Sequence, residues 1–119
     1  MAPERASAVM SRQAGVFAAL GDETRLSLLT ALGRSGDLSI SRLSEGRSVT
    51  RQAITKHLRI MTRAGLVRGV RRGREVRYIL QPSSLALARQ SLDRISAQWD
   101  AALMRLKDSI ENDTKDARS

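Results

Sequence analysis

The sequence has no cysteine, one histidine, three aromatic residues and two prolines in 119 positions. Without cysteine, the chain cannot form disulfides, bind metals through thiolates or use a thiol nucleophile. No apolar run approaches the roughly 20 residues that a membrane-spanning helix requires, and the N-terminus lacks the apolar segment of a secretion signal. We therefore expect a cytoplasmic protein.

Acidic residues are also scarce, because Asp and Glu number 12 against 21 Lys and Arg, which gives a net charge of +9. Such a surplus attracts polyanions, and nucleic acid is the first partner class to consider. A membrane-binding helix would carry bulky apolar residues opposite its charges, but Phe17, Tyr78 and Trp99 are scattered along the chain. We expect no membrane partner. The length suits one domain, residues 1–119, with a modest core.

Two helices are predicted in the first 36 residues. Apolar residues at helical spacing indicate a first helix from Ser7 to Leu20. Asp22 is a suitable N-cap for a second, and Gly33 and Gly36 provide its stop.

Two further helices and a hairpin follow. Ser39 is a plausible N-cap for a short third helix, and either Ser48 or Thr50 caps a fourth that runs to about Ala64. The stretch LVRGVRRGREVRYIL places residues typical of strands on either side of Arg72-Gly73, which predicts a β-hairpin and the only sheet.

Pro82 opens a long last helix, expected over 82–112, with a frayed tail over 113–119. Its apolar residues Leu85, Leu92, Trp99 and Leu106 repeat every seven positions, which is typical of a helical seam.

A short helix, a turn, a longer helix and a hairpin form the order of a winged helix-turn-helix, whose second helix enters the DNA major groove. The fourth helix is amphipathic. Its apolar face carries Ile54, Leu58 and Met61, and its polar face carries Gln52, Lys56, Arg59 and Arg63. The charges alone are also compatible with an ordinary solvated face. Their position between a turn and a hairpin favours DNA binding.

Three segments, LGDETRLSLLTAL, DLSISRLSE and SVTRQAITKHLRIMTRAGLV, together with the basic hairpin, resemble the ArsR/SmtB family of bacterial winged-helix repressors over residues 15–81. The resemblance implies a mainly α fold with a small β-hairpin wing, dimeric through the first and last helices. It also implies that the front of the fourth helix meets bases and nearby phosphates. The candidates there are Thr50, Arg51, Gln52, Thr55 and Lys56, and Arg59 and Arg63 are expected to meet phosphate or water.

Side-chain chemistry supports this division. Arg51 can read guanine, Gln52 can pair with adenine through two hydrogen bonds, and Thr55 offers a hydroxyl and a methyl group. In the hairpin, Arg71, Arg72 and Arg74 surround Gly73 and are expected to follow phosphates or enter a narrow minor groove. The alternative is an exposed turn kept soluble by its charge.

His57 lies at the edge of the apolar face, and three roles are open to it: metal ligand, general base, or packing with one ring nitrogen free for backbone or DNA phosphate. A metal site needs several converging ligands, and the chain has no second histidine. The positions where relatives bind metals carry Ser, Leu, Arg and isolated acids. No oriented nucleophile accompanies the ring. We predict packing with a possible DNA contact, and neither metal, cofactor nor catalytic residue; Arg25 is interpreted as structural.

The resemblance also implies a homodimer. Its predicted interface residues are Val16, Phe17 and Leu20 on the first helix and Leu92, Ile95, Trp99, Leu103 and Leu106 on the last. The alternative is a last helix that folds back onto its own subunit.

The sequence therefore predicts a homodimeric repressor that binds an inverted repeat in double-stranded DNA, is not an enzyme, and responds to no metal. The inducer, a small molecule or a protein, is open. One rival is the same fold responding to a metal or small ligand, and another is a basic architectural or RNA-binding protein.

Overall fold

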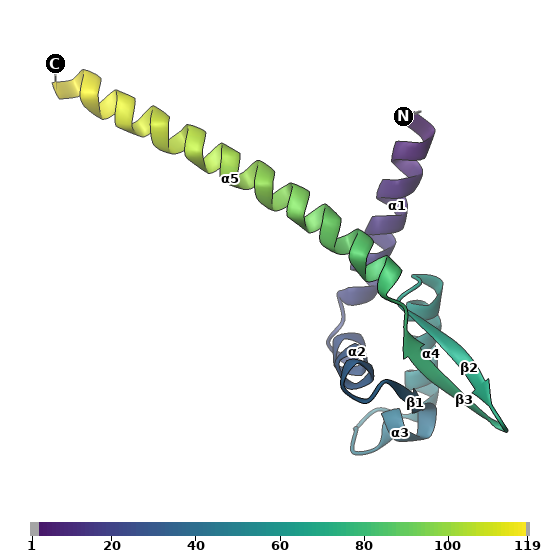
Figure 1. The fold of residues 1–119 in the computed structure, drawn as a ribbon. Coiled ribbons are helices and arrows are strands. Elements are labelled where there is room, and N and C mark those ends of the chain that lie inside the picture. Colours follow the sequence, from purple (N-terminus) through teal and green to yellow (C-terminus); the bar gives the residue numbers. More distant parts are fainter. Residues whose placement is uncertain (1–2, 119) are drawn as a thin grey trace. The chain divides into compact units, whose positions relative to one another are not determined.

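The computed structural model describes the backbone of residues 3–118 and the side chains of residues 7–114. Five helices and three strands follow one another along this part of the chain (Figure 1). They are α1 (Pro3–Leu20), α2 (Glu23–Ser35), β1 (Asp37–Ser39), α3 (Ile40–Ser44), α4 (Arg51–Arg63), β2 (Val67–Arg72), β3 (Glu75–Leu80) and α5 (Pro82–Arg118).

The chain divides into two compact units, residues 1–88 and residues 89–119. The first contains every element up to the opening turns of α5, and the second is the remainder of that helix. The sequence predicted a single domain. The second unit is a single helix without a core of its own, and the single-domain prediction for residues 1–119 stays a prediction.

Short polar side chains fix where the helices begin. The side chains of Asp22, Ser39 and Thr50 accept hydrogen bonds from the backbone N–H groups three residues later. Thr50, not Ser48, therefore caps α4, with its hydroxyl 3.1 Å from the nitrogen of Ala53. At the end of α2, Gly36 has φ 87°, a left-handed conformation that favours glycine.

The sheet has three antiparallel strands in the order β1-β3-β2. The predicted hairpin is confirmed, with Gly73 in its turn at φ 65°. Strand β1 was not predicted, because a strand of three residues is too short to show alternation. Its pairing with β3 places Asp37 opposite Ile79.

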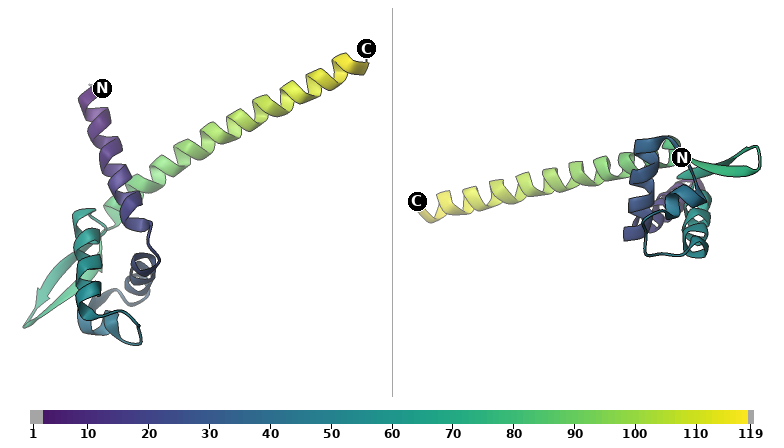
Figure 2. Two further views of the ribbon diagram at one scale, coloured as in Figure 1. Left: turned by 180° about the vertical axis from the view of Figure 1, so that it is seen from behind. Right: turned by 90° about the horizontal axis from the view of Figure 1, so that it is seen from below.

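The core of the first unit joins α1, α2, α3, α4 and the start of β2. From the left-hand view in Figure 2, α4 lies beside the β2–β3 hairpin. The fully or nearly fully buried apolar residues are Val16, Ala19, Leu28, Leu32, Leu43, Ile54, Leu58, Met61, Leu66, Val67 and Ala88. Each fully buried Leu, Ile or Met stabilises the fold by about 1.5–3 kcal/mol relative to an exposed one.

Helix α5 is longer than the sequence predicted. It extends to Arg118, so the tail predicted to fray after residue 112 is helical as far as the structure describes it. Extending an existing helix fixes one residue for each new hydrogen bond, so an apolar pattern is not needed for it to continue. No helix among residues 3–118 combines the length and apolarity required to cross a bilayer.

Candidate DNA-binding surface

Helix α4 carries a buried face and an exposed cationic face. Ile54, Leu58 and Met61 are buried in the core, and these three contacts fix which side of the helix faces outward. The outward side presents Arg51, Gln52, Lys56, Arg59 and Arg63, with Thr55 half-exposed among them. Six predicted residues of the recognition helix therefore share one surface.

Thr50 and Thr55 each use their hydroxyl within the helix. The Thr50 hydroxyl accepts from the nitrogen of Ala53, and the Thr55 hydroxyl donates to the carbonyl of Arg51 at 2.9 Å. Thr55 therefore presents its methyl group and a remaining acceptor lone pair to a partner.

His57 does not share the cationic face. Its Nδ1 lies 3.3 Å from Nη1 of Arg25 and 3.9 Å from Oδ2 of Asp22, both at the start of α2. The side chain is only 21% exposed. The predicted packing at the edge of the apolar face is thus what the structure shows, and this geometry directs Nδ1 to α2 instead of to a partner.

Arg25 joins three helices. Its Nε donates to the carbonyl of Ala19 at 2.6 Å and its Nη2 to that of Ala18 at 3.3 Å, so it satisfies carbonyls at the end of α1. Arg25 also contacts His57 on α4. Its interpretation as structural agrees with these contacts.

Asp22 completes this cluster. The backbone N–H of Arg25 donates to its carboxylate, and this bond lowers the pKa of Asp22 from its usual value of 3.8, against a smaller raising effect of desolvation. The positive charge of Arg25 and the neighbouring His57 lower the pKa further.

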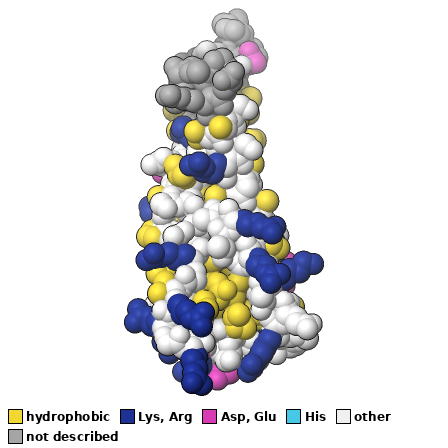
Figure 3. All heavy atoms as spheres, turned by 90° about the vertical axis from the view of Figure 1, so that its right-hand side faces the viewer, with side chains coloured by type: hydrophobic (Ala, Val, Ile, Leu, Met, Phe, Trp, Pro, Cys, Tyr) yellow, Lys and Arg dark blue, Asp and Glu magenta, His cyan; other side chains and the backbone are white. Residues whose placement is uncertain are grey.

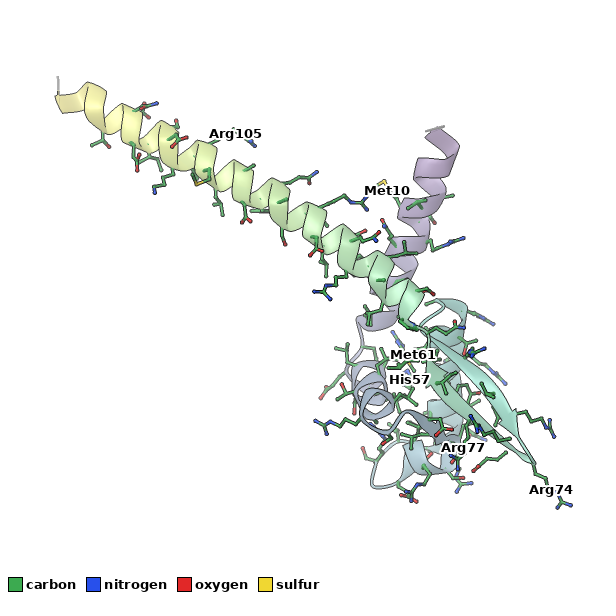
Figure 4. The ribbon with its side chains drawn as sticks, in the orientation of Figure 1. Met10, His57, Met61, Arg74, Arg77 and Arg105 are labelled. Carbon is green, nitrogen blue, oxygen red and sulfur yellow. The ribbon has the colours of Figure 1, made fainter. Side chains whose placement is uncertain are left out.

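The three hairpin arginines are not equivalent. Successive residues of a strand point to opposite faces, so Arg71 and Arg72 do not share a side. Arg72 approaches Asp37 of β1, with Nε 3.7 Å from Oδ2. Arg74 lies at the hairpin tip, directed away from the rest of the unit (Figure 4). Arg72 therefore has a counter-charge on β1 that the sequence did not reveal, and its contact with DNA stays a prediction.

Arg77 lies on the same face of the hairpin as Arg72 and makes closer contacts with acidic residues. Arg77 contacts Glu75 at 3.2 Å and Asp37 at 3.4 Å. The hydrogen bond to Glu75 and the charge of Asp37 raise the pKa of the Arg77 guanidinium. This network fastens the hairpin to β1.

One concave part of the surface was not predicted from the sequence. Thr62, Gly69 and Tyr78 line a cavity of about 280 Å³ together with Arg59 and Arg63. No local pattern marks these residues, because they come together only when the hairpin packs beside α4.

The predicted dimer residues fall into two groups. Val16 is completely buried in the core of its own unit and has no surface for a partner, while Phe17 and Leu20 are half-buried against that core. Val16 was predicted at the interface because the resemblance assigns the first helix to dimerisation without indicating which of its apolar residues face inward. The second group of predicted dimer residues lies on α5, and their side chains are 46–66% exposed. These residues are Leu92, Ile95, Trp99, Leu103 and Leu106.

Comparison with known proteins identifies the fold's family. A model described as a helix-turn-helix domain matches residues 20–70. The chain is 33% identical over 96 residues to the HTH-type transcriptional regulator Rv2034 of Mycobacterium tuberculosis, which covers 81% of this chain and 89% of that protein. It is 31% identical over 78 residues to the arsenical resistance operon repressor of Escherichia coli K12, which covers 66% of this chain and 67% of that protein.

A solved structure described as an ArsR-like transcriptional regulator from Rhodococcus sp. RHA1 matches with a TM-score of 0.72 and 46% identity, over 82% of this chain and 92% of that one. The chain belongs to the ArsR/SmtB family. It is a winged helix-turn-helix transcriptional regulator that binds DNA, and family membership indicates no enzyme activity. In this ArsR-family protein, α3 and α4 form the helix-turn-helix and the β2–β3 hairpin is the wing.

Proposed function

We propose that this ArsR-family regulator is a homodimeric repressor that binds an inverted-repeat operator and whose DNA binding does not respond to metal ions. The exposed face of α4 carries the proposal. Within residues 7–114, none of its cations forms an ion pair within 4.0 Å. These cations are Arg51, Lys56, Arg59 and Arg63. A row of unpaired cations on one helix face is what a phosphate backbone neutralises.

Two side chains at the front of that face suit base reading. Arg51 and Gln52 are exposed in the first turn of α4, and their geometry allows paired hydrogen bonds to guanine and adenine. The N-terminal residues of a recognition helix are the ones that contact base edges in helix-turn-helix proteins.

The exposed apolar strip of α5 supports the dimer. Leu92, Trp99 and Leu106 recur every seven residues, and Ile95, Leu103 and Ile110 lie beside them on the same side of the helix. An apolar strip of this length is costly in water, and the same strip of a second copy can cover it. Two-fold symmetry would then present two α4 helices to the halves of an inverted repeat.

The surroundings of His57 support metal independence. Its Nδ1 already contacts the guanidinium of Arg25 at 3.3 Å, so this nitrogen is occupied by a protein partner. Among the residues that the structure describes, no three His, Asp or Glu residues lie close enough to hold a metal. Repression is supported by the similarity to the E. coli arsenical resistance operon repressor.

The dimer is tested by Trp99→Glu, with Ala101→Glu as the matched control. Both residues are exposed, but Ala101 lies two positions further on and therefore on the other side of the helix. Sedimentation should show a dimer for wild type and for the control, and a monomer with much weaker operator binding for Trp99→Glu. A Trp99→Glu protein that stays dimeric would remove the α5 strip from the proposal.

Metal independence is tested by titrating zinc, nickel and copper against the protein on labelled operator DNA, with a chelator as reference. We expect equal binding in every case and only a modest change for His57→Gln. Stoichiometric release of DNA by one of these metals, absent in His57→Gln, would contradict this part of the proposal.

A further inference from the structure

A notch lies where the end of α4 meets the wing. Its walls are Arg59, Thr62 and Arg63 from α4 and Gly69 and Tyr78 from the hairpin. The three helical residues stand at i, i+3 and i+4 and so line the same side of the helix. The volume, about 280 Å³, exceeds the space of several water molecules and accommodates a hydrated phosphodiester.

The floor of the notch depends on a glycine. Gly69 pairs with Tyr78 across the hairpin. A Cβ atom at Gly69 would lie 3.0 Å from Cγ1 of Val76, and 3.6 and 3.8 Å from Cε1 and Cζ of Tyr78. The tyrosine ring therefore packs against the backbone of β2 at Gly69; a Cβ there would make an ordinary contact with the ring but would require Val76 to shift slightly.

The ring of Tyr78 lines one side of the notch, and its hydroxyl is available to donate a hydrogen bond. Its ring is partly buried against the core, which holds it in place. No hydrogen bond of its hydroxyl occurs among residues 7–114, and the hydroxyl is not a buried unsatisfied group. Thr62 contributes no donor, because its hydroxyl donates to the carbonyl of Leu58 at 2.7 Å. The donors of the notch are thus the phenol and the guanidinium groups of Arg59 and Arg63.

Charge separates this notch from a second cavity on the same unit. That cavity, about 300 Å³, is lined by Arg42 and Arg77 but also by Asp37, which already pairs with Arg77. Arg59 and Arg63 have no such counter-ion in the described residues, so the notch retains its positive charge. Figure 3 shows arginine and lysine side chains around a small hydrophobic patch at the lower end of the unit.

We propose that this notch binds one phosphate of the DNA backbone, held by Arg59, Arg63 and the hydroxyl of Tyr78, and that this phosphate bridges the recognition helix and the wing. The proposal rests on the docking of α4 proposed above. A DNA phosphate is favoured over a free anion because the notch continues the exposed cationic face of α4. On the wing, Arg71 shares the strand face of Gly69, two residues away, so the same positive surface continues toward the hairpin tip.

The notch is tested with Arg63→Gln, which removes the charge but keeps a polar side chain, and Tyr78→Phe, which removes only the hydroxyl. Arg34→Gln is the control, since Arg34 is an exposed arginine in the last turn of α2 and gives the same change in net charge. The slope of log K against log salt is negative for a protein that binds phosphates. On an arbitrary duplex, Arg63→Gln should make this slope less negative by about 1, and Arg34→Gln should leave it unchanged. Tyr78→Phe should weaken binding about 2- to 10-fold with little change of slope.

A methylphosphonate scan locates the contact. Each phosphate of a selected operator is replaced singly by its neutral analogue, and binding is measured for wild type and both variants. Neutralising one particular phosphate in each half-site should weaken wild-type binding but add little to the loss in Arg63→Gln, and the same phosphate should couple to Tyr78→Phe. Coupling of the two residues to different phosphates would overturn the shared notch.

The outcomes separate the two proposals. If wild type selects no inverted repeat, the operator proposal fails, and the slope on the arbitrary duplex still decides the notch. An unchanged slope for Arg63→Gln, with a circular-dichroism spectrum and urea midpoint like those of wild type, would overturn it.

Discussion

Nη1 of Arg25 lies 3.3 Å from Nδ1 of His57, so a side chain of α2 contacts one of the recognition helix. Arginine cannot accept a hydrogen bond, so in a bond between these atoms Nδ1 of His57 is the acceptor. The same guanidinium donates to the carbonyl of Ala19 at the end of α1. Arg25 therefore ties α4 to the junction of the first two helices, which sets the direction in which α4 is presented.

Replacing Arg25 tests this role. Arg25→Lys keeps the charge but loses the fork that reaches two carbonyls and the imidazole together. We expect a loss of about 1–3 kcal/mol in the free energy of unfolding, measured in urea, because hydrogen bonds from a charged donor are lost. Arg34→Lys, at an exposed site, should change it little. Equal stability of the two variants would mean that Arg25 does not hold the junction.

Asp22 gives a dependence of stability on pH. Its pKa is lowered in the folded protein, so its ionised form stabilises the fold above its usual value of 3.8, and this contribution is lost as the pH falls through the lowered pKa. Asp22→Asn keeps a side chain that caps helices well but does not titrate. The stability difference between wild type and Asp22→Asn should be constant near neutral pH and shrink in acid. A difference that grows in acid would reverse the assigned direction.

The cap of α4 is tested by two alanine substitutions. Thr50→Ala removes the hydroxyl that accepts from the nitrogen of Ala53 and should cost about 0.5–2 kcal/mol of unfolding free energy. Ser48→Ala, two residues earlier and exposed, should cost almost nothing. The two thermal midpoints measure the contrast directly, and the reverse order would place the cap at Ser48.

Substitutions of the two adjacent wing arginines, Arg71 and Arg72, should affect DNA binding unequally. Arg71 faces the same side as the notch, whereas Arg72 lies 3.7 Å from Asp37. Arg71→Gln should weaken binding to all duplexes and lower the salt slope by about 1. Arg72→Gln should lower it less, since part of its charge is already compensated. Equal slopes for the two variants would show that Asp37 releases Arg72 on DNA.

Local patterns were sufficient for much of the fold. The caps Asp22 and Ser39, the end of α4 before Gly65 and the hairpin turn at Gly73 each depend on residues within a few positions of one another. Strand β1 was missed because it exists only through pairing with β3, some 40 residues later.

The candidate DNA-binding surface was likewise predictable only where it depends on local sequence. Helical periodicity identified the exposed cations of α4, including Arg59. It did not identify the partners of His57 and Arg72, because Arg25 and Asp37 are remote in sequence and reach them only through tertiary packing. The position of Tyr78 in the notch was not predicted for the same reason, since its place beside Gly69 follows from strand pairing.

The central claim is that α4 reads DNA sequence, and selection from random duplexes by wild type and by Gln52→Ala tests it most directly. Wild type should enrich an inverted repeat. Gln52→Ala should enrich the same repeat with the preference relaxed at one position in each half-site, at a cost of about 1–3 kcal/mol on the original site. Enrichment of no shared sequence by wild type, or of an identical sequence by both proteins, would contradict the account.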